Sequence, residues 1–156
     1  MATFGTFVSG QVLTAAELNT AGEWQDFTPT FTQSATITKT VNFARYTQLG
    51  KWVQVQIRMT ATGAGTANNI IKVGLPVNAS ANNFLMGSAY FWDGGSSGTG
   101  YPLFATFDSA STCAFIGVYV DESAPGSSQF GLSAAINAVT VANTDVIFLN
   151  LAYEAA

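Results

Sequence analysis

The feature that most constrains the fold is a strict alternation of apolar and polar residues between Trp52 and Met59. Side chains point alternately to the two faces of a β-strand, so this pattern predicts a half-buried strand over 52–59. Its apolar positions are Val53, Val55, Ile57 and Met59, and its polar positions are Gln54, Gln56 and Arg58. Similar runs follow, separated by clusters of Gly, Asn, Ser and Pro. Further strands are expected at 36–46, 69–75, 84–92, 103–108, 113–121, 129–136 and 145–154.

These strands determine the expected fold class. Short strands with turn residues between them are typical of antiparallel sandwiches and barrels. Parallel βαβ units would need crossover helices, for which the spacing leaves no room. A chain of 156 residues is one domain's worth and can bury a substantial core. We therefore expect an all-β, antiparallel, jelly-roll-like sandwich over residues 27–156. In the strand at 36–46, the expected apolar positions are Ile37, Val41 and Phe43.

Residues 1–26 differ from this body and form an expected N-terminal arm. Thr14 and Glu17 have the spacing of a capping box, which predicts a short helix that ends between Asn19 and Gly22. Such a short helix is marginal alone and needs a surface to dock on. The arm is either a decoration of the domain itself or an anchor on another protein. The apolar contacts of such an anchor would be Phe4, Phe7, Val8, Val12, Leu13 and Leu18.

The charge content bears on partners. Charged residues make up 9% of the chain, against about 25% in an ordinary globular domain. A net charge of −4 with five basic residues argues against nucleic acid. No apolar run approaches the roughly 18 residues of a membrane helix, so membrane insertion is not expected. The strand faces are rich in uncharged hydrogen-bonding groups, which avoid the cost of burying charge when subunits meet, and this favours a homo-oligomer.

The composition also narrows the chemistry. The chain has no histidine, which removes the commonest general base and histidine metal sites. Its single cysteine, Cys113, lies in an apolar run and is interpreted as a buried thiol rather than a nucleophile. No metal or cofactor motif is present, and the acidic residues are scattered singly along strand ends and turns. The expected protein is not an enzyme; a polysaccharide-degrading enzyme with paired carboxylates is the remote alternative.

A binding loop is the more plausible kind of site. Trp92 and Asp93 lead into the glycine-rich stretch 94–100, and Tyr101 leads out of it. Aromatic faces beside acidic and hydroxyl groups suit a sugar, because rings stack on C–H groups while polar atoms bind hydroxyls. Trp92, Asp93 and Tyr101 are therefore the candidate glycan contacts. The competing interpretation is that these aromatic residues are ordinary strand residues that belong to the core or cap a strand end.

Several segments together resemble tailed-bacteriophage virion appendage proteins. Residues 10–19 match their opening pattern G-x-x-L-T-A-x-x-(L/M/V)-N, and residues 44–55 look like the strand–turn–strand of phage fibre and jelly-roll domains. Residues 71–76 are similar to the strand end that precedes a proline in those proteins, and 147–153 fit their closing strand.

This resemblance implies a virion structural protein, often trimeric, with an exposed β-sandwich and an N-terminal segment that holds the particle through residues 1–22. The family has no shared catalytic residues, so none is carried over. The chain lacks a collagen-like, coiled-coil or β-helical shaft, which favours a short appendage or knob on the tail or capsid. Contact with host-surface glycan and a purely structural role as a capsid decoration or joining protein are the two open alternatives. The opening Met-Ala-Thr-Phe lacks the segments of a secretory signal, so synthesis in the host cytoplasm is expected.

Overall fold

The computed structural model of the chain describes residues 10, 12, 14, 22–66, 69–83, 85–95, 98–120, 130–133 and 140–156. These residues form strands and turns and no helix, so the expected all-β class is confirmed. Accordingly, this part of the chain contains no helix of the length and apolarity needed to cross a membrane. The expected helix lies outside the described residues apart from Thr14. The anchor residues Phe4, Phe7, Val8, Leu13 and Leu18 also lie outside them.

Eleven strands form one antiparallel sheet within the described residues. They are β1 (Gln25–Asp26), β2 (Phe31–Gln33), β3 (Ala35–Thr36), β4 (Lys39–Leu49), β5 (Trp52–Ala61), β6 (Ile71–Gly74), β7 (Leu85–Asp93), β8 (Thr99–Ser109), β9 (Thr112–Val120), β10 (Phe130–Ser133) and β11 (Val146–Glu154). Their order is β1-β4-β5-β11-β7-β8-β9-β6-β2-β3, and β10 pairs with β9. The last strand of the chain thus occupies the space between β5 and β7.

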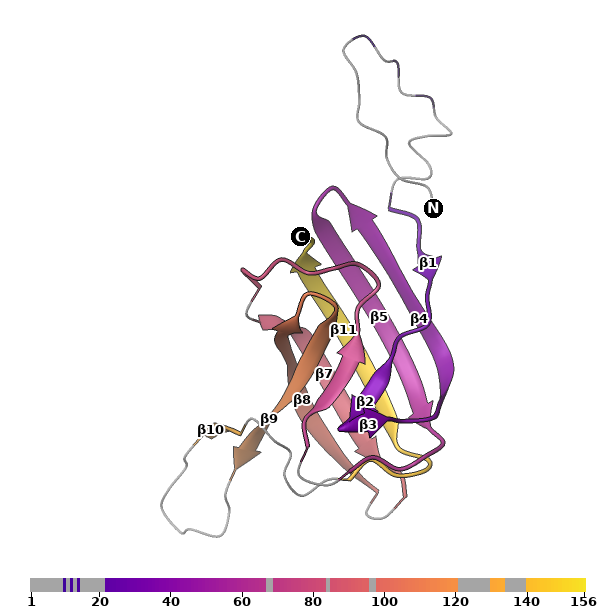
Figure 1. Ribbon diagram of the computed structural model, residues 1–156, viewed down its shortest axis with the longest axis vertical. Coiled ribbons are helices and arrows are strands. Elements are labelled where there is room, and N and C mark those ends of the chain that lie inside the picture. The colour runs from indigo at the N-terminus through magenta and orange to yellow at the C-terminus, as the bar shows by residue number, and fades with distance from the viewer. Residues whose placement is uncertain are drawn as a thin grey trace.

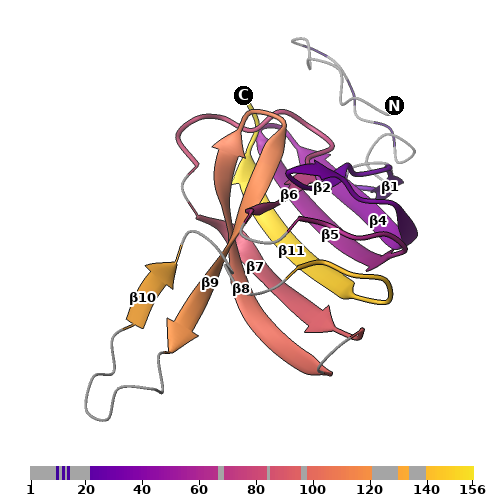
Figure 2. The same cartoon turned by 60° about the horizontal axis from the view of Figure 1, so that its bottom comes forward.

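The sheet curls so that its two halves pack against each other. Figure 1 shows β6 and β2 in front of β5 and β11, and Figure 2 shows the same crossing from below. Phe31 of β2 and Val73 of β6 belong to the same buried cluster as Val55 of β5 and Leu149 of β11. The core therefore lies between two layers. The rear layer consists of β4, β5, β11, β7 and β8, and these strands turn their other face outward.

The predicted alternation of apolar and polar residues is confirmed in β5. Its expected apolar positions are all buried: Val53, Val55, Ile57 and Met59. β5 runs antiparallel to β4 on one side and to β11 on the other, so it is covered along both edges. The remaining expected strands also appear, with ends shifted by a few residues, and of the stretch 129–136 the structure describes β10.

The strand expected at 36–46 differs from the prediction in one respect. Ala35–Thr36 belongs to β3, and β4 begins at Lys39. The pairing of β4 with β5 slips between Val41 and Phe43, where Asn42 is the additional residue of a β-bulge. A bulge inserts one residue and reverses the alternation beyond it. Phe43 consequently points outward instead of into the core, and Ala44 takes the buried position.

The described chain joins the sheet through β1, which pairs with β4 at Gln25↔Tyr46 and Asp26↔Arg45. Phe27 packs edge-on against Tyr46, with ring centroids 5.8 Å apart. These contacts attach the start of the body to the outer strand of the rear layer. The division between an arm at 1–26 and a body at 27–156 stays a prediction.

Candidate functional site

The three residues singled out as glycan contacts do not share a surface. Phe91 pairs with Tyr101 and Trp92 with Gly100 in the β7–β8 ladder, so neighbouring residues alternate between inside and outside. Trp92 points outward and is 40% exposed, whereas Asp93 is 8% exposed. Tyr101 packs against the core beside Phe91, with ring centroids 6.1 Å apart. Trp92 is therefore accessible from the outer face, and the other two lie on the opposite side of the ladder.

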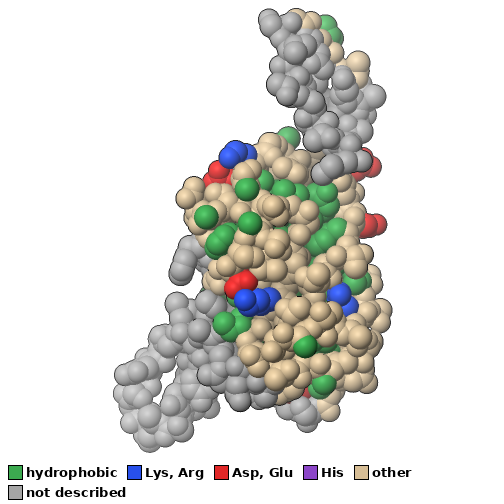
Figure 3. Space-filling view, in the orientation of Figure 1, with side chains coloured by type: hydrophobic (Ala, Val, Ile, Leu, Met, Phe, Trp, Pro, Cys, Tyr) green, Lys and Arg blue, Asp and Glu red, His purple; other side chains and the backbone are tan. Residues whose placement is uncertain are grey.

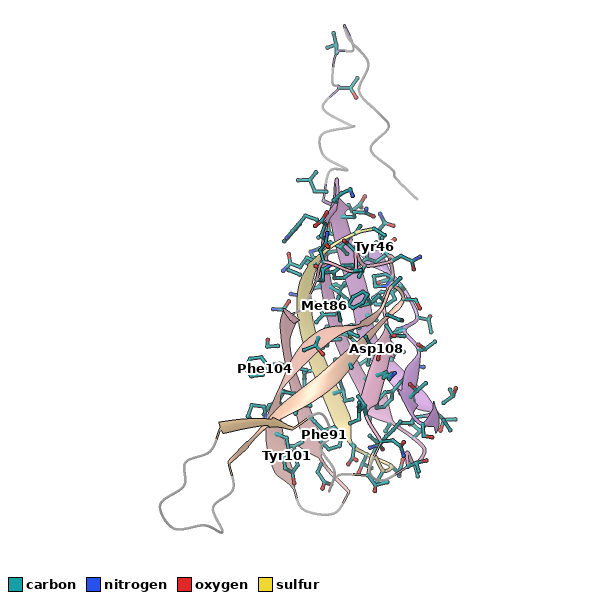
Figure 4. All side chains as sticks on the ribbon, turned by 60° about the vertical axis from the view of Figure 1, so that its left-hand side comes forward. Tyr46, Met86, Phe91, Tyr101, Phe104 and Asp108 are labelled. Carbon is teal, nitrogen blue, oxygen red and sulfur yellow. The ribbon has the colours of Figure 1, made fainter. Side chains whose placement is uncertain are left out.

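The outer face of β4, β5, β11, β7 and β8 carries exposed aromatic residues, most of which the prediction missed. The large exposed apolar side chains on these strands are Phe43, Leu49, Trp52, Tyr90, Trp92, Phe104 and Phe148. Figure 4 shows Phe104 pointing away from the sheet, whereas Met86 and Tyr46 lie between the layers. We call this outward surface of β4, β5, β11, β7 and β8 the aromatic face.

One row of side chains crosses the aromatic face from strand to strand. Phe43 pairs with Arg58, Arg58 with Phe148 and Phe148 with Tyr90, so the four lie side by side on β4, β5, β11 and β7. The Tyr90 and Phe148 ring centroids are 6.3 Å apart. The guanidinium carbon of Arg58 lies 5.2 Å from the Phe148 ring centroid, a cation–π distance. This row forms an aromatic ridge with a single charge inside it.

A second row, parallel to the first, is polar. Arg45, Gln56, Asn150 and Ser88 are consecutive register partners across the same four strands. Side chains from the two rows line a shallow depression of about 320 Å³. Its lining residues are Phe43, Gln56, Ile57, Ser88, Ala89, Tyr90, Phe148, Leu149 and Asn150. Ring faces and uncharged hydrogen-bonding groups therefore meet in one hollow. This combination of groups was expected in the loop after Trp92 instead.

The two arginines of this face have different surroundings. Arg45 donates two hydrogen bonds to Gln56 Oε1, at 2.8 and 3.1 Å, and stacks 4.8 Å from the Trp24 ring. Asp26 of β1 is its register neighbour. Arg58 has no ion pair among the described residues. The ion pairs found there lie elsewhere, between Lys51 and Glu154 at 3.8 Å and between Lys72 and Asp108 at 2.8 Å.

Two acidic residues that look scattered in the sequence come together in the fold. Asp145 is 1% exposed and accepts hydrogen bonds from the amides of Gly94, Gly95 and Ala142, at 3.0, 3.2 and 2.7 Å. Burial raises the pKa of Asp145, with a smaller contribution from the charge of Asp93, and the amides oppose this. The carboxylate thereby holds the turn after β7 to the turn before β11. This is a structural contact within the fold.

Cys113 lies in the core, as expected. It is fully buried, and its thiol lies 3.6 Å from the Val73 carbonyl oxygen. Burial raises the pKa of this thiol to about 12. A nucleophilic cysteine needs the thiolate form, so this thiol is inert at neutral pH.

The comparisons with known proteins return no relative. No family model, no curated protein and no solved structure matches the chain. Among the described residues, no group of three or more His, Cys, Asp or Glu side chains could hold a metal ion. The site must therefore be interpreted from its own chemistry. Ring faces can pack on C–H groups, and amide and hydroxyl groups can form hydrogen bonds with hydroxyls beside them.

Proposed function

We propose that this chain is a non-enzymatic surface appendage of a tailed-phage virion that contacts host-surface glycan through its aromatic face. The single observation that carries this proposal is a row of exposed aromatic rings, interrupted by Arg58, that lies beside a polar row across one open sheet. A cluster of exposed aromatic side chains on one sheet face marks a candidate ligand surface, and sugar rings can stack on such side chains. Weak copies of such a surface on one particle would bind by avidity.

The assembly in this proposal is a homo-oligomer, with a trimer favoured by the resemblance to phage appendages. Residues 1–22 would attach it to a neighbouring virion protein, and the body would have a jelly-roll-like sandwich architecture. The curled, two-layer sheet and its buried core support the sandwich. The low charge content supports contact between copies, since few charges need be buried.

The test is binding of the full chain to a panel of bacterial surface polysaccharides. We expect Tyr90→Ala to weaken binding about tenfold, because a stacked aromatic contact is worth about 1 kcal/mol or more. Leu49→Ala is the matched control, since Leu49 is also exposed and apolar but does not line the depression. Binding that Leu49→Ala and Tyr90→Ala reduce equally would remove the depression from the proposal. Properly folded full chain that binds no polysaccharide would overturn the glycan contact altogether.

A capsid decoration or joining protein is the second candidate, and one observation favours it. Figure 3 shows the opposite layer as a surface of mainly uncharged side chains with only isolated or paired charges. Such a surface suits burial against other coat subunits. This role predicts that the full chain binds phage particles lacking it and shows no affinity for host cells. Binding to host cells alone would count against it.

A further inference from the structure

The unmatched charge on the aromatic face indicates which glycans it would take. Arg58 lies between Phe43 of β4 and Phe148 of β11 in the cross-strand register. Its outward neighbours along β5 are Gln56 and Thr60, which carry no charge. The guanidinium thus sits at the centre of the ridge with rings on both sides and no carboxylate beside it.

The other charges of the described chain do not compensate for Arg58. Glu154 pairs with Lys51, and Asp108 pairs with Lys72. Asp93 and Asp145 are buried at the end of the sheet, Asp26 lies in register with Arg45, and Glu23 directly precedes Trp24, whose ring stacks on Arg45. A protein with a net charge of −4 therefore presents a positive group on its aromatic face, in register with Phe43 and Phe148, which line the hollow. This arrangement is complementary to a ligand that carries negative charge.

The geometry of Arg58 suits a carboxylate. A guanidinium stacked on an aromatic ring still presents its N–H donors along its edges, in a fork that matches carboxylate oxygens. The flanking rings of Phe43, Phe148 and Tyr90 can stack on a ligand that offers a flat face of C–H groups. A pyranose ring that bears a carboxylate offers both groups, whereas a polyol phosphate offers the charge without the ring face.

We propose that the aromatic face binds a polysaccharide containing uronic acid residues, with Arg58 pairing to their carboxylates. This inference rests on the proposed function and names the class of glycan. The sugar rings stack on Phe148 and Tyr90, while Gln56 and Asn150 bind their hydroxyls. From β4 to β7 the hollow spans three strand spacings, or about 14 Å, which accommodates a short run of sugar units.

A second copy of the chain in a two-fold contact is a less suitable occupant of this face. A two-fold contact would bring identical surfaces together. It would enclose two Arg58 guanidiniums with no carboxylate from the centre of either face. Burying unpaired charges is costly, so charge complementarity favours an acidic ligand over self-association here.

The test measures binding of the full chain to polygalacturonate by isothermal titration calorimetry, with dextran and inorganic polyphosphate as comparison polymers. We expect tighter binding to polygalacturonate than to dextran, which lacks the carboxylate, and to polyphosphate, which lacks the ring. Arg58→Gln should weaken polygalacturonate binding about tenfold or more, because hydrogen bonds to charged groups are among the stronger ones. Lys51→Gln is the matched control: it makes the same change in net charge, and Lys51 lies in the turn between β4 and β5, outside the row of Phe43, Phe148 and Tyr90.

Each result separates the possibilities. Equal loss in Arg58→Gln and Lys51→Gln would mean general attraction to polyanions and would overturn the assignment. Equal binding to polygalacturonate and dextran, with no effect of Arg58→Gln, would overturn the acidic-sugar inference and leave the glycan proposal standing. Failure to bind any polymer, together with a change of solution mass in Arg58→Gln, would assign the face to contact between copies and overturn both. Circular dichroism of each variant checks that it is folded.

Discussion

The two faces of β5, β11 and β7 are built from the same strands, but one carries buried apolar side chains and the other carries exposed aromatic and polar side chains. The inner face carries Val55, Leu149 and Phe91, each buried between the layers. The outer face carries Arg58, Phe148 and polar residues along the neighbouring row. Burial of apolar area accounts for the inner side chains. Burial in the core does not account for the outer aromatic residues, and the proposed glycan contact supplies a reason for their exposure.

The largest test of this contrast compares two neighbouring residues of β7. Phe91→Ala removes a fully buried ring, and we expect a loss of about 3–5 kcal/mol in the free energy of unfolding. Trp92→Ala removes a larger side chain from the outer face, and we expect a loss below about 1 kcal/mol. Urea denaturation of both variants measures the difference. A similar loss in the two would show that the outer face is also covered, and the contrast between the faces would fail.

An intermediate effect is expected at the buried carboxylate of Asp145. Asp145→Ala leaves the amides of Gly94, Gly95 and Ala142 without this acceptor, and we expect a loss of about 1–3 kcal/mol. The pKa of Asp145 is raised above 3.8 in the folded protein. Between pH 3.8 and the folded pKa, the carboxyl group is therefore protonated in the folded state and ionised in the unfolded state. Its contribution to stability is therefore full below pH 3.8 and declines as the pH rises through the folded pKa.

The measurement for Asp145 is denaturation of the wild-type protein and Asp145→Ala at several pH values. The difference between them should be largest at the acidic end and shrink as the pH rises. A difference that grows with pH would mean that the three amides outweigh burial and that the pKa is lowered instead.

The smallest effect is expected at the ion pair between Lys72 of β6 and Asp108 of β8. Burial alone would raise the pKa of Asp108, but hydrogen bonds from Lys72 and Thr112 and the charge of Lys72 together hold it below 3.8. The contribution is present above pH 3.8 and is lost as the pH falls through the folded pKa. Both groups are partly exposed, so Asp108→Asn should cost less than about 1 kcal/mol. Thermal unfolding at pH 7 checks this, and a larger loss would indicate a charge more deeply involved in the core.

The sequence predicts the inner face well because burial leaves a periodic pattern. The alternation in β5 identifies Val53, Val55 and Ile57 as core, and turn clusters locate most strand ends. The apolar run around Cys113 similarly indicates its burial. These inferences depend on short-range periodicity, which a single strand carries in its own residues.

The parts that escape prediction depend on partners far away in the chain. The bulge at Asn42 reverses the direction of Phe43, and the residues around it carry no mark of the extra residue. Phe148 lies in a run that is apolar on both sides, so it reads as core until the pairing with Arg58 and Tyr90 shows its outward row. The uninterrupted apolar run is the one sequence signal that this strand is unusual, because a half-exposed strand normally alternates apolar and polar residues.

Gln33 gives the same lesson for buried polar groups. It is fully buried, and its amide joins two distant segments, donating to the Asn69 carbonyl oxygen at 3.1 Å and accepting from the Val141 amide at 3.0 Å. A glutamine in a short strand would ordinarily be assigned to the surface. Only the three-dimensional arrangement supplies the partners that make its burial acceptable.

The place of β11 between β5 and β7 has a consequence for how the protein is made. On the ribosome, β4 and β5 can pair early, and so can β7 and β8, but their facing edges stay open until residues 146–154 emerge. Open edges with apolar neighbours are sites of intermolecular pairing. A chain without residues 146–154 would thus expose two half-sheets with unpaired facing edges.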